Sequence, residues 1–190
     1  MRLVMLGGTF NPPHLGHLKI AEAVRQEFGY EKLVLVPSFI PAHKDIEGGV
    51  SFHKRKIMTE LSIRDREFAF VSDCEYRRKG VSYSIDTIRY LKQEYTEGEK
   101  PGLVIGDDLV GGFVRWHEAE HLAEEADIII CHRGDPKDLD FPFPHRYFQN
   151  TIYNVSSSEI RTLLKQGEDV SSYLVPSVLE FIHTQGLYGV

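Results

Sequence analysis

The sequence has few cysteines, no long apolar run and no excess of positive charge. Its two cysteines, Cys74 and Cys131, do not form a CxxC pair, and their spacing does not indicate a disulfide framework. The apolar run from Leu3 to Leu6 is far shorter than a signal peptide, and no run reaches the roughly 18 apolar residues of a membrane span. We therefore expect a cytoplasmic protein that has no membrane partner.

The net charge and the length of the chain further restrict the class of protein. The formal net charge of −6 argues against broad nucleic-acid binding, in which a basic surface supplies most of the affinity. A hydrophobic content of 42% with 26% charged residues is typical of a globular protein. The 190 residues contain no repeat, low-complexity tract or linker, so we expect one domain spanning 1–190 that holds any anionic ligand in a local site.

The first seventeen residues, MRLVMLGGTFNPPHLGH, predict a strand, a glycine turn and the start of a helix. The apolar run ends at Gly7 and Gly8, where the lack of a Cβ lets backbone N–H groups approach a polyphosphate. His14 and His17 follow with i, i+3 spacing, which places both imidazoles on one face of the helix start, where partial positive charge accumulates. This stretch therefore predicts a phosphate-binding turn with two histidines directed at it.

Strand and helix patterns alternate along the rest of the chain. A helix at 17–28 followed by the apolar strand KLVLVP at 32–37 completes a strand–helix–strand unit, which implies a parallel sheet with a right-handed crossover. We therefore expect a three-layer, Rossmann-like α/β fold with ligands beyond the carboxyl ends of the strands. Segments 38–50 and 132–150 are expected to be a surface loop and an irregular region. Further strands are expected at 68–71, 103–105, 127–131 and near 152–155, and further helices at 51–64, 84–95, 116–126, 157–165 and 176–183.

The segment GGTFNPPHLGH resembles the GGTFDPxHxGH signature of the nucleotidylyltransferase superfamily, and four separated segments together resemble the bacterial nicotinate-nucleotide adenylyltransferases over essentially the whole chain. The resemblance implies a Rossmann-like three-layer α/β fold with a central parallel sheet. It also implies adenylyl transfer from ATP to nicotinate mononucleotide, with Mg²⁺, giving nicotinate adenine dinucleotide and pyrophosphate in NAD biosynthesis. Asn11 departs from the signature, since the family usually has Asp there, and any role for that charge would be lost.

In this family the opening motif binds ATP, and the resemblance implies that His14 and His17 stabilise charge on the triphosphate while the α-phosphorus is attacked. Arg161 is the third residue implied in catalysis. Because the attacking phosphate is already anionic and pyrophosphate is a competent leaving group, positioning and charge neutralisation should dominate. The implied ATP-binding residues are Gly7, Gly8, Thr9, Phe10, His14, His17, Gly106, Asp108, Ser157 and Arg161.

The segment VSSSEIR at 155–161 resembles the family's ISSTxIR signature near the C-terminus. Serines ahead of a helix offer hydroxyls and N–H groups to a phosphate, and the planar fork of Arg161 can bridge two phosphate oxygens. Ser156 and Glu159 also fit a capping box, so a plain capped helix with a solvated arginine is the alternative. For the functional reading to hold, this segment and the N-terminal glycine turn must converge on one triphosphate.

A third motif, GDD at 106–108, fits the family's GxD at the end of a strand. The resemblance implies that Gly106 permits close approach of the nucleotide and that Asp108 accepts hydrogen bonds from ribose hydroxyls. Asp107 is the nearest competitor for that role. An aspartate at the end of a strand is also a common turn residue, which is the alternative here.

Three short segments are implied in binding the acceptor mononucleotide. PAHK resembles the family's PPHK, so that Lys44, with Arg55 beyond the loop, would meet the mononucleotide phosphate; alanine replaces the second proline. VSYSIDT resembles SYTxDT, in which the Ser84 position faces the pyridine carboxylate. Trp116 is implied to stack on the pyridine ring, beside the backbone of His117. The alternatives are a tryptophan that belongs to the core and a solvated Lys44.

A rival motif, HEAEH at 117–121, matches the HExxH pattern of zinc hydrolases, in which two histidines one helical turn apart bind zinc and the glutamate acts as base. A solvated, charged helix face is the alternative that we favour, so we expect no metal site in the chain itself. The same transfer chemistry with nicotinamide mononucleotide or another phosphate acceptor stays open, as does a nucleotide-binding module without catalysis. The sequence leaves a homo-oligomer open as well.

Overall fold

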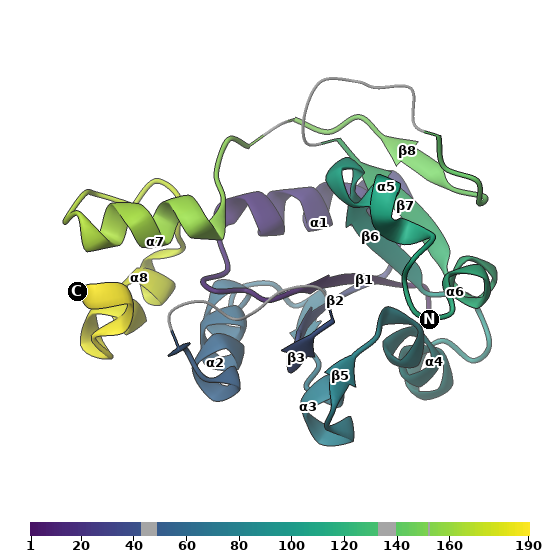
Figure 1. The fold of residues 1–190 in the computed structure, drawn as a ribbon, viewed down its shortest axis with the longest axis horizontal. Helices are drawn as coiled ribbons and strands as arrows, with labels where there is room; N and C mark the ends of the chain where they lie inside the picture. Colours follow the sequence, from purple (N-terminus) through teal and green to yellow (C-terminus); the bar gives the residue numbers. More distant parts are fainter. Residues whose placement is uncertain (43–48, 133–139, 152) are drawn as a thin grey trace.

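The computed structural model describes residues 1–42, 49–132, 140–151 and 153–190, and places them in an α/β fold around a parallel sheet (Figure 1). The six-stranded main sheet has the order β4-β2-β1-β6-β7-β8, and every neighbouring pair in it is parallel. Its strands are β1 (Leu3–Gly8), β2 (Lys32–Pro37), β4 (Ala69–Val71), β6 (Gly102–Gly106), β7 (Asp127–Cys131) and β8 (Arg146–Phe148). The short strands β3 (Ile40–Pro41) and β5 (Val81–Ser82) pair with each other. The helices are α1 (Leu15–Glu27), α2 (Phe52–Ser62), α3 (Cys74–Arg78), α4 (Ser84–Tyr95), α5 (Val110–Phe113), α6 (Ala119–Glu125), α7 (Ser157–Lys165) and α8 (Pro176–Thr184), with 3-10 turns η2 (Asp107–Leu109) and η3 (Leu187–Gly189).

The side chains of the central strands alternate between the two faces of the sheet, and helices pack on both faces. In β1, Leu3 and Met5 pack on one face of the sheet while Val4 and Leu6 pack on the other, because successive side chains of a strand point to opposite faces. Helix α1 covers the face of Val4 and Leu6, whereas α3, α4, α5 and α6 cover the opposite face. The central strands are therefore buried on both sides, which accounts for their continuous apolar sequences. The α/β class and the parallel sheet expected from the sequence are confirmed.

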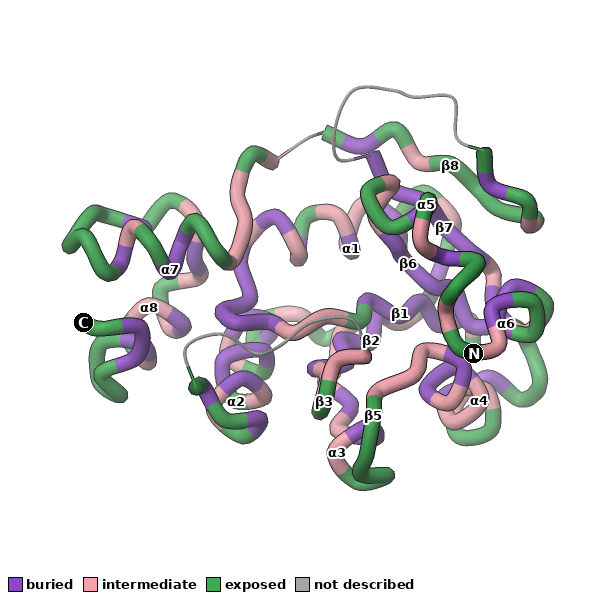
Figure 2. The backbone as a smooth tube through the Cα atoms, viewed as in Figure 1, coloured by how far each residue is buried: buried purple, intermediate pink, exposed green. Residues whose placement is uncertain are grey.

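A third apolar cluster joins α2 to α7, α8 and η3 near the C-terminus. Figure 2 shows α7 and α8 at one end of the molecule, each with buried positions on one side and exposed positions on the other. In α7 the buried positions Ile160 and Leu164 are spaced by one helical turn, as an amphipathic helix requires. No helix in the described part of the chain is long and apolar enough to cross a bilayer.

The strand order creates a crevice between β1 and β6. After β1 the chain adds β2 and β4 on one side, then returns to β6 and continues to β7 and β8 on the other side. In open parallel sheets, ligands bind beyond the carboxyl ends of the strands where the order reverses in this way. The carboxyl ends that meet here carry Gly7 and Gly8 on β1 and Gly106 on β6.

Three local predictions from the sequence are wrong. The helix expected from residue 116 begins only at Ala119, because Glu118 has a left-handed backbone (φ 50°) that a continuing helix does not allow. The region expected to be irregular contains β8, an edge strand that forms by pairing with β7. The strand expected near 152–155 is not formed by residues 153–155, and residue 152 lies outside the described residues.

Candidate active site

The loop between β1 and α1 is shaped by Phe10, whose backbone has a left-handed conformation (φ 49°) that bulky residues rarely adopt. The Phe10 ring is buried, and its edge meets the ring of His17 at 5.2 Å between centroids. A Cβ on Gly8 would lie 3.3 Å from the Phe10 ring. Glycine at this position therefore lets the loop close over the ring without displacing it.

His14 and His17 lie at the start of α1 with their rings stacked, 3.7 Å between centroids. His14 is the N-cap residue, and its backbone N–H donates to Nδ1 of His17 over 3.2 Å. Since Nδ1 of His17 accepts this bond, the neutral ring carries its hydrogen on Nε2, which makes Nε2 a donor. Gly16 makes room for the stack, because a Cβ there would lie 3.0 Å from Nδ1 of His14 and 3.2 Å from Val155.

The serine–arginine segment lies directly against this loop. The Ser157 hydroxyl donates to the carbonyl of Pro12, and Nη1 of Arg161 donates to the carbonyl of Asn11, each over 2.9 Å. Nη2 of Arg161 donates to the hydroxyl of Ser158 over 3.0 Å. Arg161 is buried, which excludes the alternative of a solvated arginine. The two motifs therefore meet, as their functional reading requires.

Half of the capping box expected in this segment is formed at the start of α7, where Ser156 is the N-cap residue. The Ser156 hydroxyl oxygen accepts from the backbone N–H of Glu159 over 3.2 Å, and the same hydroxyl donates to the Glu159 carboxylate over 2.7 Å. These bonds fix the helix start that carries Ser157 toward the N-terminal loop. Residues 156–159 therefore both cap α7 and contact the N-terminal loop.

Asn11, which stands where the family usually has Asp, is buried and accepts at Oδ1 a hydrogen bond from the hydroxyl of Tyr188 over 2.7 Å. Burial raises the pKa of Tyr188, so this hydroxyl stays protonated and donates. The neutral amide keeps one acceptor oxygen for this bond, as an aspartate would, and lacks the negative charge. Tyr188 was not predicted from the sequence, since the stretch LYGV that contains it carries no motif.

Arg55 on α2 points into the protein and binds backbone carbonyls. Its side chain is 0% exposed, and its terminal nitrogens donate to the carbonyls of Thr9 and Ser38, each over 2.7 Å. Burial lowers the pKa of Arg55, although an arginine remains charged. It supports the loop after β1, and the direct contact with a mononucleotide that the sequence suggested is not what this geometry offers. Lys44, the other residue implied at that phosphate, lies outside the described residues.

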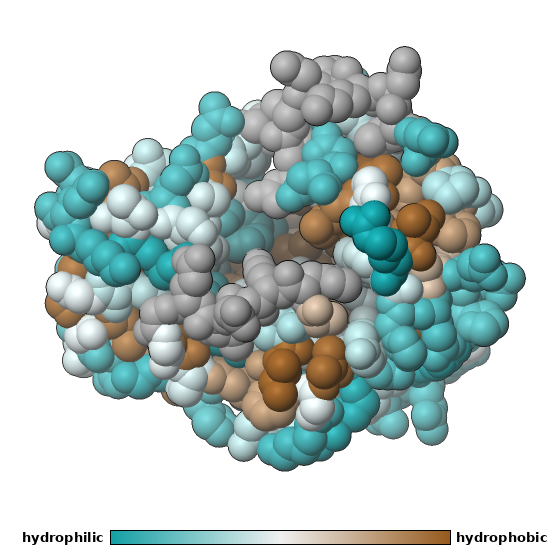
Figure 3. Space-filling model, in the orientation of Figure 1, coloured by the Kyte–Doolittle hydropathy of each residue, from teal (hydrophilic) through white to brown (hydrophobic). Residues whose placement is uncertain are grey.

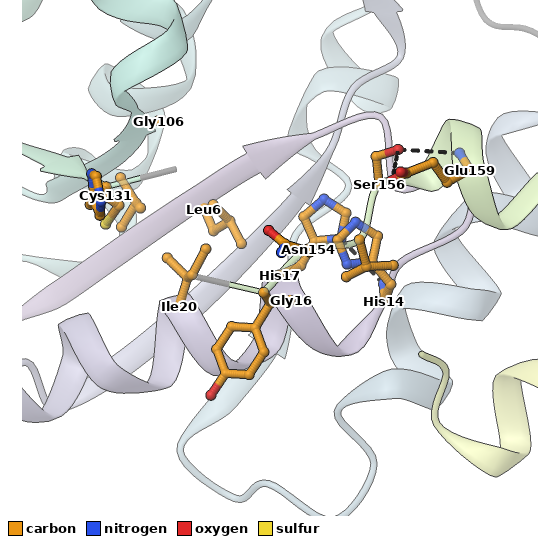
Figure 4. A pocket seen from close by; sticks show the side chains of 14 residues that line it. Leu6, His14, Gly16, His17, Ile20, Gly106, Cys131, Asn154, Ser156 and Glu159 are labelled. Atoms are coloured by element: carbon orange, nitrogen blue, oxygen red, sulfur yellow. Dashed lines mark hydrogen bonds between the residues drawn. The ribbon is translucent and has the colours of Figure 1, made fainter. Parts of the chain in front are cut away.

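A pocket of about 350 Å³ lies beyond the carboxyl ends of β1, β6 and β7, beside α1. Figure 4 shows its two ends: His14, His17 and Ser156 lie at one, and Cys131 and Gly106 lie toward the other. Apolar side chains from β1 and α1 line the pocket between these ends. The pocket therefore connects the histidine pair with the ends of β6 and β7 across an apolar floor.

Gly106 lines this pocket, whereas the two aspartates that follow it belong to η2. The Asp107 carboxylate lies 3.3 Å from Nδ1 of His132, and the Tyr147 hydroxyl lies 2.9 Å from the same nitrogen. Asp108 is exposed, which is compatible with the ribose role that the resemblance implies for it. His132 is a buried lining residue that the sequence gave no reason to single out.

Three of the residues implied in binding the acceptor, Ser84, Trp116 and His117, belong to or adjoin elements that cover the face of the sheet opposite α1. Ser84 is the first residue of α4, a helix of 12 residues whose opening N–H groups carry partial positive charge. Tyr83, just before it, stacks on the ring of His117 with 4.2 Å between centroids. Trp116 is half-buried and stacks on Phe113 at 4.9 Å, so it packs on the core and also presents part of its ring to solvent.

A buried carboxylate ties these acceptor elements together. Glu75 on α3 accepts from the Thr87 hydroxyl on α4 over 2.9 Å and from the backbone N–H of Phe39, next to β3, over 3.3 Å. The Ser82 hydroxyl on β5 accepts from the same N–H over 3.0 Å. Burial raises the pKa of Glu75. Glu75 belongs to no motif in the sequence, although its partner Thr87 lies within the SYSIDT segment that resembles the family's SYTxDT.

Exposed apolar side chains border the acceptor side. Ile40 and Val81 are exposed on the β3–β5 pair, and Leu109 and Val114 are exposed on either side of α5. Figure 3 shows hydrophobic surface over both regions and a hollow near the middle of this face. Apolar surface of this kind suits a flat aromatic ligand.

The HEAEH motif does not form a zinc site. His117 precedes α6 instead of lying on it, so the two histidines are not one helical turn apart on a single helix. The Glu118 carboxylate is bound by Nη2 of Arg89 over 2.8 Å, and this arginine lowers the pKa of Glu118. Among the residues that the structure describes, no three His, Cys, Asp or Glu side chains gather as metal ligands. The charged-surface alternative is thus favoured.

Comparisons with known proteins place the chain in a family. A family model for cytidylyltransferase-like proteins matches residues 5–163. The probable nicotinate-nucleotide adenylyltransferase of Borreliella afzelii (strain PKo) is 38% identical over 189 residues, covering 99% of this chain and 97% of that protein. The protein of the same name from Geobacter metallireducens is 36% identical over 214 residues, with coverage of 99% and 98%.

Solved structures agree on the fold. The Plasmodium falciparum nicotinic acid mononucleotide adenylyltransferase, complexed with NaAD, superposes with a TM-score of 0.80 at 22% identity, covering 98% of this chain and 97% of that one. At this level of identity the likeness supports the architecture. Since the family model matches most of the chain and the curated relatives are similar over nearly its full length, the chain belongs to the cytidylyltransferase-like family and, within it, to the nicotinate-nucleotide adenylyltransferases.

Proposed function

We propose that the protein transfers the adenylyl group of ATP to nicotinate mononucleotide and releases pyrophosphate. The observation that carries the proposal is the junction of the two motifs: Ser157 and Arg161 bind the loop after β1 beside the stacked histidines. The curated relatives carry the name of this activity. We also propose, as the sequence suggested, that residues 1–190 act as one domain in the cytoplasm.

The histidine pair supplies donors for the triphosphate. His17 offers Nε2–H, its ring direction is fixed by the stack on His14, and the first turn of α1 adds backbone N–H groups. Arg161 holds the carbonyl of Asn11 and adds its positive charge next to the loop. Because the mononucleotide phosphate is already an anionic nucleophile, the chain has to align two phosphates and neutralise charge, and it has no proton to move.

The nucleoside of ATP lies in the pocket beside α1 in this proposal. The backbone of Gly7, Gly8 and Thr9 borders the phosphates, and Gly106 allows the sugar to approach the end of β6. Asp108, which is exposed in η2, accepts from the ribose hydroxyls. The apolar floor between the two ends of the pocket packs against the nucleoside.

The acceptor reaches the crevice from the opposite face of the sheet. The start of α4 at Ser84 receives the pyridine carboxylate, because the partial positive charge of a helix N-terminus favours an anion over a neutral amide. Trp116 stacks on the pyridine ring, next to His117, which Tyr83 holds in place. Lys44 meets the mononucleotide phosphate, and Arg55 contributes by holding the loop after β1.

Nucleotidyl transfer from ATP uses a divalent cation, which we propose is Mg²⁺. The side chains at the phosphate end of the pocket are the imidazoles of His14 and His17, the Ser156 hydroxyl and the Glu159 carboxylate. Mg²⁺ prefers carboxylate, phosphate and water oxygens, but this carboxylate already accepts a hydrogen bond from Ser156. The ion would therefore be carried by the phosphates of ATP, where it supplies charge neutralisation. Excess chelator should abolish pyrophosphate release and added Mg²⁺ should restore it, while the melting temperature stays unchanged. Full turnover in the presence of chelator would contradict this assignment.

The proposed function is tested by measuring pyrophosphate release from ATP with nicotinate mononucleotide, with nicotinamide mononucleotide and without an acceptor. We expect release only with an acceptor, and kcat/KM for the acid about ten-fold or more above that for the amide, because the site pairs an anion with a helix N-terminus. Pyrophosphate release that responds to neither mononucleotide would overturn the proposal. Equal use of both would retain the transfer chemistry and remove the assigned acceptor.

A further inference from the structure

His132 lies at the end of the pocket farthest from the histidine pair. It directly follows Cys131, which Figure 4 places at that end, and its side chain is 6% exposed while lining the pocket. Strand β7, which precedes it, is two places from β1 in the sheet, and a spacing of about 4.8 Å between strands puts their ends about 10 Å apart. That separation suits a nucleoside triphosphate whose phosphates lie at the histidine pair and whose base lies beside His132.

Two side chains fix the His132 ring through the same nitrogen. The Asp107 carboxylate on η2 lies 3.3 Å from Nδ1, and the Tyr147 hydroxyl on β8 lies 2.9 Å from it. A carboxylate can only accept, so its approach favours a hydrogen on Nδ1, whereas a hydroxyl can donate or accept and adapts to either form. Burial raises the pKa of Tyr147, so its hydroxyl stays neutral.

The choice of tautomer decides what the other ring nitrogen can recognise. With the hydrogen on Nδ1, Nε2 of His132 carries a lone pair and acts as an acceptor. An acceptor on a side chain that is only 6% exposed pairs with a donor such as an amino group. A carbonyl oxygen placed there would leave two acceptors facing each other away from water, which costs binding free energy.

We propose that His132 reads the purine base of the nucleotide, with Nε2 accepting a hydrogen bond from the 6-amino group of adenine. The residue thereby selects ATP over 6-oxo purine nucleotides such as ITP. This inference rests on the proposed function, because it needs a nucleoside triphosphate in this pocket. Asp107 and Tyr147 act as positioning residues, and Asp107 sets the tautomer.

The test compares ATP with ITP by isothermal titration calorimetry without acceptor and by initial rates of pyrophosphate release with nicotinate mononucleotide. The unmodified protein should prefer ATP by about ten-fold or more, as sites that hydrogen-bond a substrate group reject analogues that lack it. The variant His132→Leu loses the acceptor, so the preference should fall toward unity through weaker ATP binding. The variant His132→Gln, whose amide can present oxygen or hydrogen, should accept both nucleotides and guards against misfolding of the leucine variant.

Two positioning variants make a matched pair. An amide at position 107 can donate to Nδ1, so Asp107→Asn should raise the use of ITP relative to ATP. The variant Tyr147→Phe keeps the carboxylate and should retain the preference for ATP. Cys131→Ala changes the volume of the same end of the pocket without replacing the ring, so it should alter ATP and ITP alike.

The outcomes separate this inference from the proposed function. A preference for ATP that survives both His132→Leu and His132→Gln would overturn the inference, as would a protein that binds ATP and ITP equally. A response to Tyr147→Phe without one to Asp107→Asn would overturn the tautomer assignment. If the protein bound ATP in preference to ITP through His132 and yet released no pyrophosphate with nicotinate mononucleotide, the proposed function would fail and the base-reading role would stand.

Discussion

His14 and His17 differ in what they offer a triphosphate, although their rings are stacked. His14 is the buried N-cap residue of α1, and its backbone N–H donates a hydrogen bond to Nδ1 of His17. His17 is partly exposed and has Nε2–H as its donor. The pair thus works as a unit in which one ring orients the other, so the consequences of replacing them should not be additive.

The first prediction concerns His17. Replacement by alanine should lower kcat by about 100-fold or more, because a donor aimed at developing phosphate charge is lost. His17→Gln keeps an amide donor and should retain more activity than the alanine variant. Both variants lose or alter the bond from the N–H of His14, so the free energy of unfolding should fall by about 1 kcal/mol.

The measurements for His17 are steady-state pyrophosphate release and chemical denaturation. As a control, His121→Ala replaces a histidine that is exposed on α6, and its turnover should match that of the unmodified protein. A His17→Ala protein that is folded and fully active would remove this residue from the chemistry.

Arg161 and Arg55 show which side-chain positions the sequence could predict and which it could not. Arg161 was assigned through its motif, and the structure brings it to the N-terminal loop as that motif requires. Arg55 was assigned by the same resemblance, yet it is fully buried and holds the carbonyls of Thr9 and Ser38. A motif predicts that an arginine is present at a position. Whether its long side chain points into the protein or toward solvent depends on carbonyls from distant parts of the chain, which the motif does not contain. Tyr188 was missed for the same reason, since its partner Asn11 is 177 positions away.

Helices and strands were predictable where their signals are local. Strand β2, helix α4, strand β7 and helix α7 have the expected bounds, because apolar runs, helical periodicity and a capping box are each contained in one segment. Strand β8 escaped prediction because the three residues of RYF form a strand only through pairing with β7. The start of α6 was misplaced since the left-handed backbone of Glu118 has no signature in a non-glycine residue.

The close approach of α1 to the segment before α7 leads to a prediction for Gly16. Alanine normally stabilises a helix by up to about 1 kcal/mol relative to glycine. At position 16, however, a Cβ would lie 3.0 Å from His14 and 3.2 Å from Val155, so the histidine ring must shift. We expect Gly16→Ala to lower kcat several-fold with no gain in thermal stability.

A matched control for this variant is Gly111→Ala, since a Cβ on Gly111 in α5 would have no neighbour within 4 Å. Its kinetics should match those of the unmodified protein. Kinetic assays and thermal melts of the two variants check the prediction. A Gly16→Ala protein with raised stability and unchanged kcat would show that the histidine stack needs no room at this position.

Glu75 links α3, α4 and the loop at β3, and its raised pKa makes this link dependent on pH. A carboxyl group whose pKa is raised by folding contributes most stability below its ordinary value of 4.5, and that contribution is lost as pH rises through the raised pKa. Glu75→Gln removes the titration. The difference in melting temperature, unmodified protein minus variant, should therefore decrease as pH increases from about 4.5.

The same variant has a kinetic readout. Because Glu75 holds Thr87 and Phe39 on the acceptor side, Glu75→Gln should raise KM for nicotinate mononucleotide more than KM for ATP. The control is Glu94→Gln, an exposed carboxylate on the same helix as Thr87, for which neither effect is expected. Equal changes in both KM values would indicate a general loss of packing instead of a role in the acceptor region.

The two ends of the chain are joined through the site itself. The C-terminal turn η3 packs with α2, α7 and α8 in one apolar cluster, and from this cluster the Tyr188 hydroxyl reaches Asn11 in the N-terminal loop. The Asn11 carbonyl in turn accepts from Arg161 of α7. Tyr188 and Arg161 therefore hold one residue of the loop from two C-terminal elements, so the packing of that cluster sets the position of the loop after β1.

This arrangement predicts the effect of Tyr188→Phe. The ring still fills its place in the cluster, but the buried Oδ1 of Asn11 loses its donor, which should cost about 1–3 kcal/mol of the free energy of unfolding. The loop should then be held less firmly, by Ser157, Arg161 and Arg55, so kcat should fall while KM for nicotinate mononucleotide changes little. Denaturation and steady-state kinetics check the two effects.

Two further variants test whether kcat depends on the hydrogen bond from Tyr188 to Asn11 or on the packing of the C-terminal apolar cluster. Tyr173→Phe changes a tyrosine in the same cluster. It should leave kcat unchanged, because the hydroxyl that binds Asn11 Oδ1 belongs to Tyr188. Asn11→Asp retains an acceptor for the Tyr188 hydroxyl but adds a negative charge beside Arg161 and near the phosphates, so it should keep the fold and raise KM for ATP. If Tyr188→Phe destabilised the protein and left kcat unchanged, the C-terminal turn would serve only folding, and the position of the loop would be set without it, by contacts such as those of Ser157, Arg161 and Arg55.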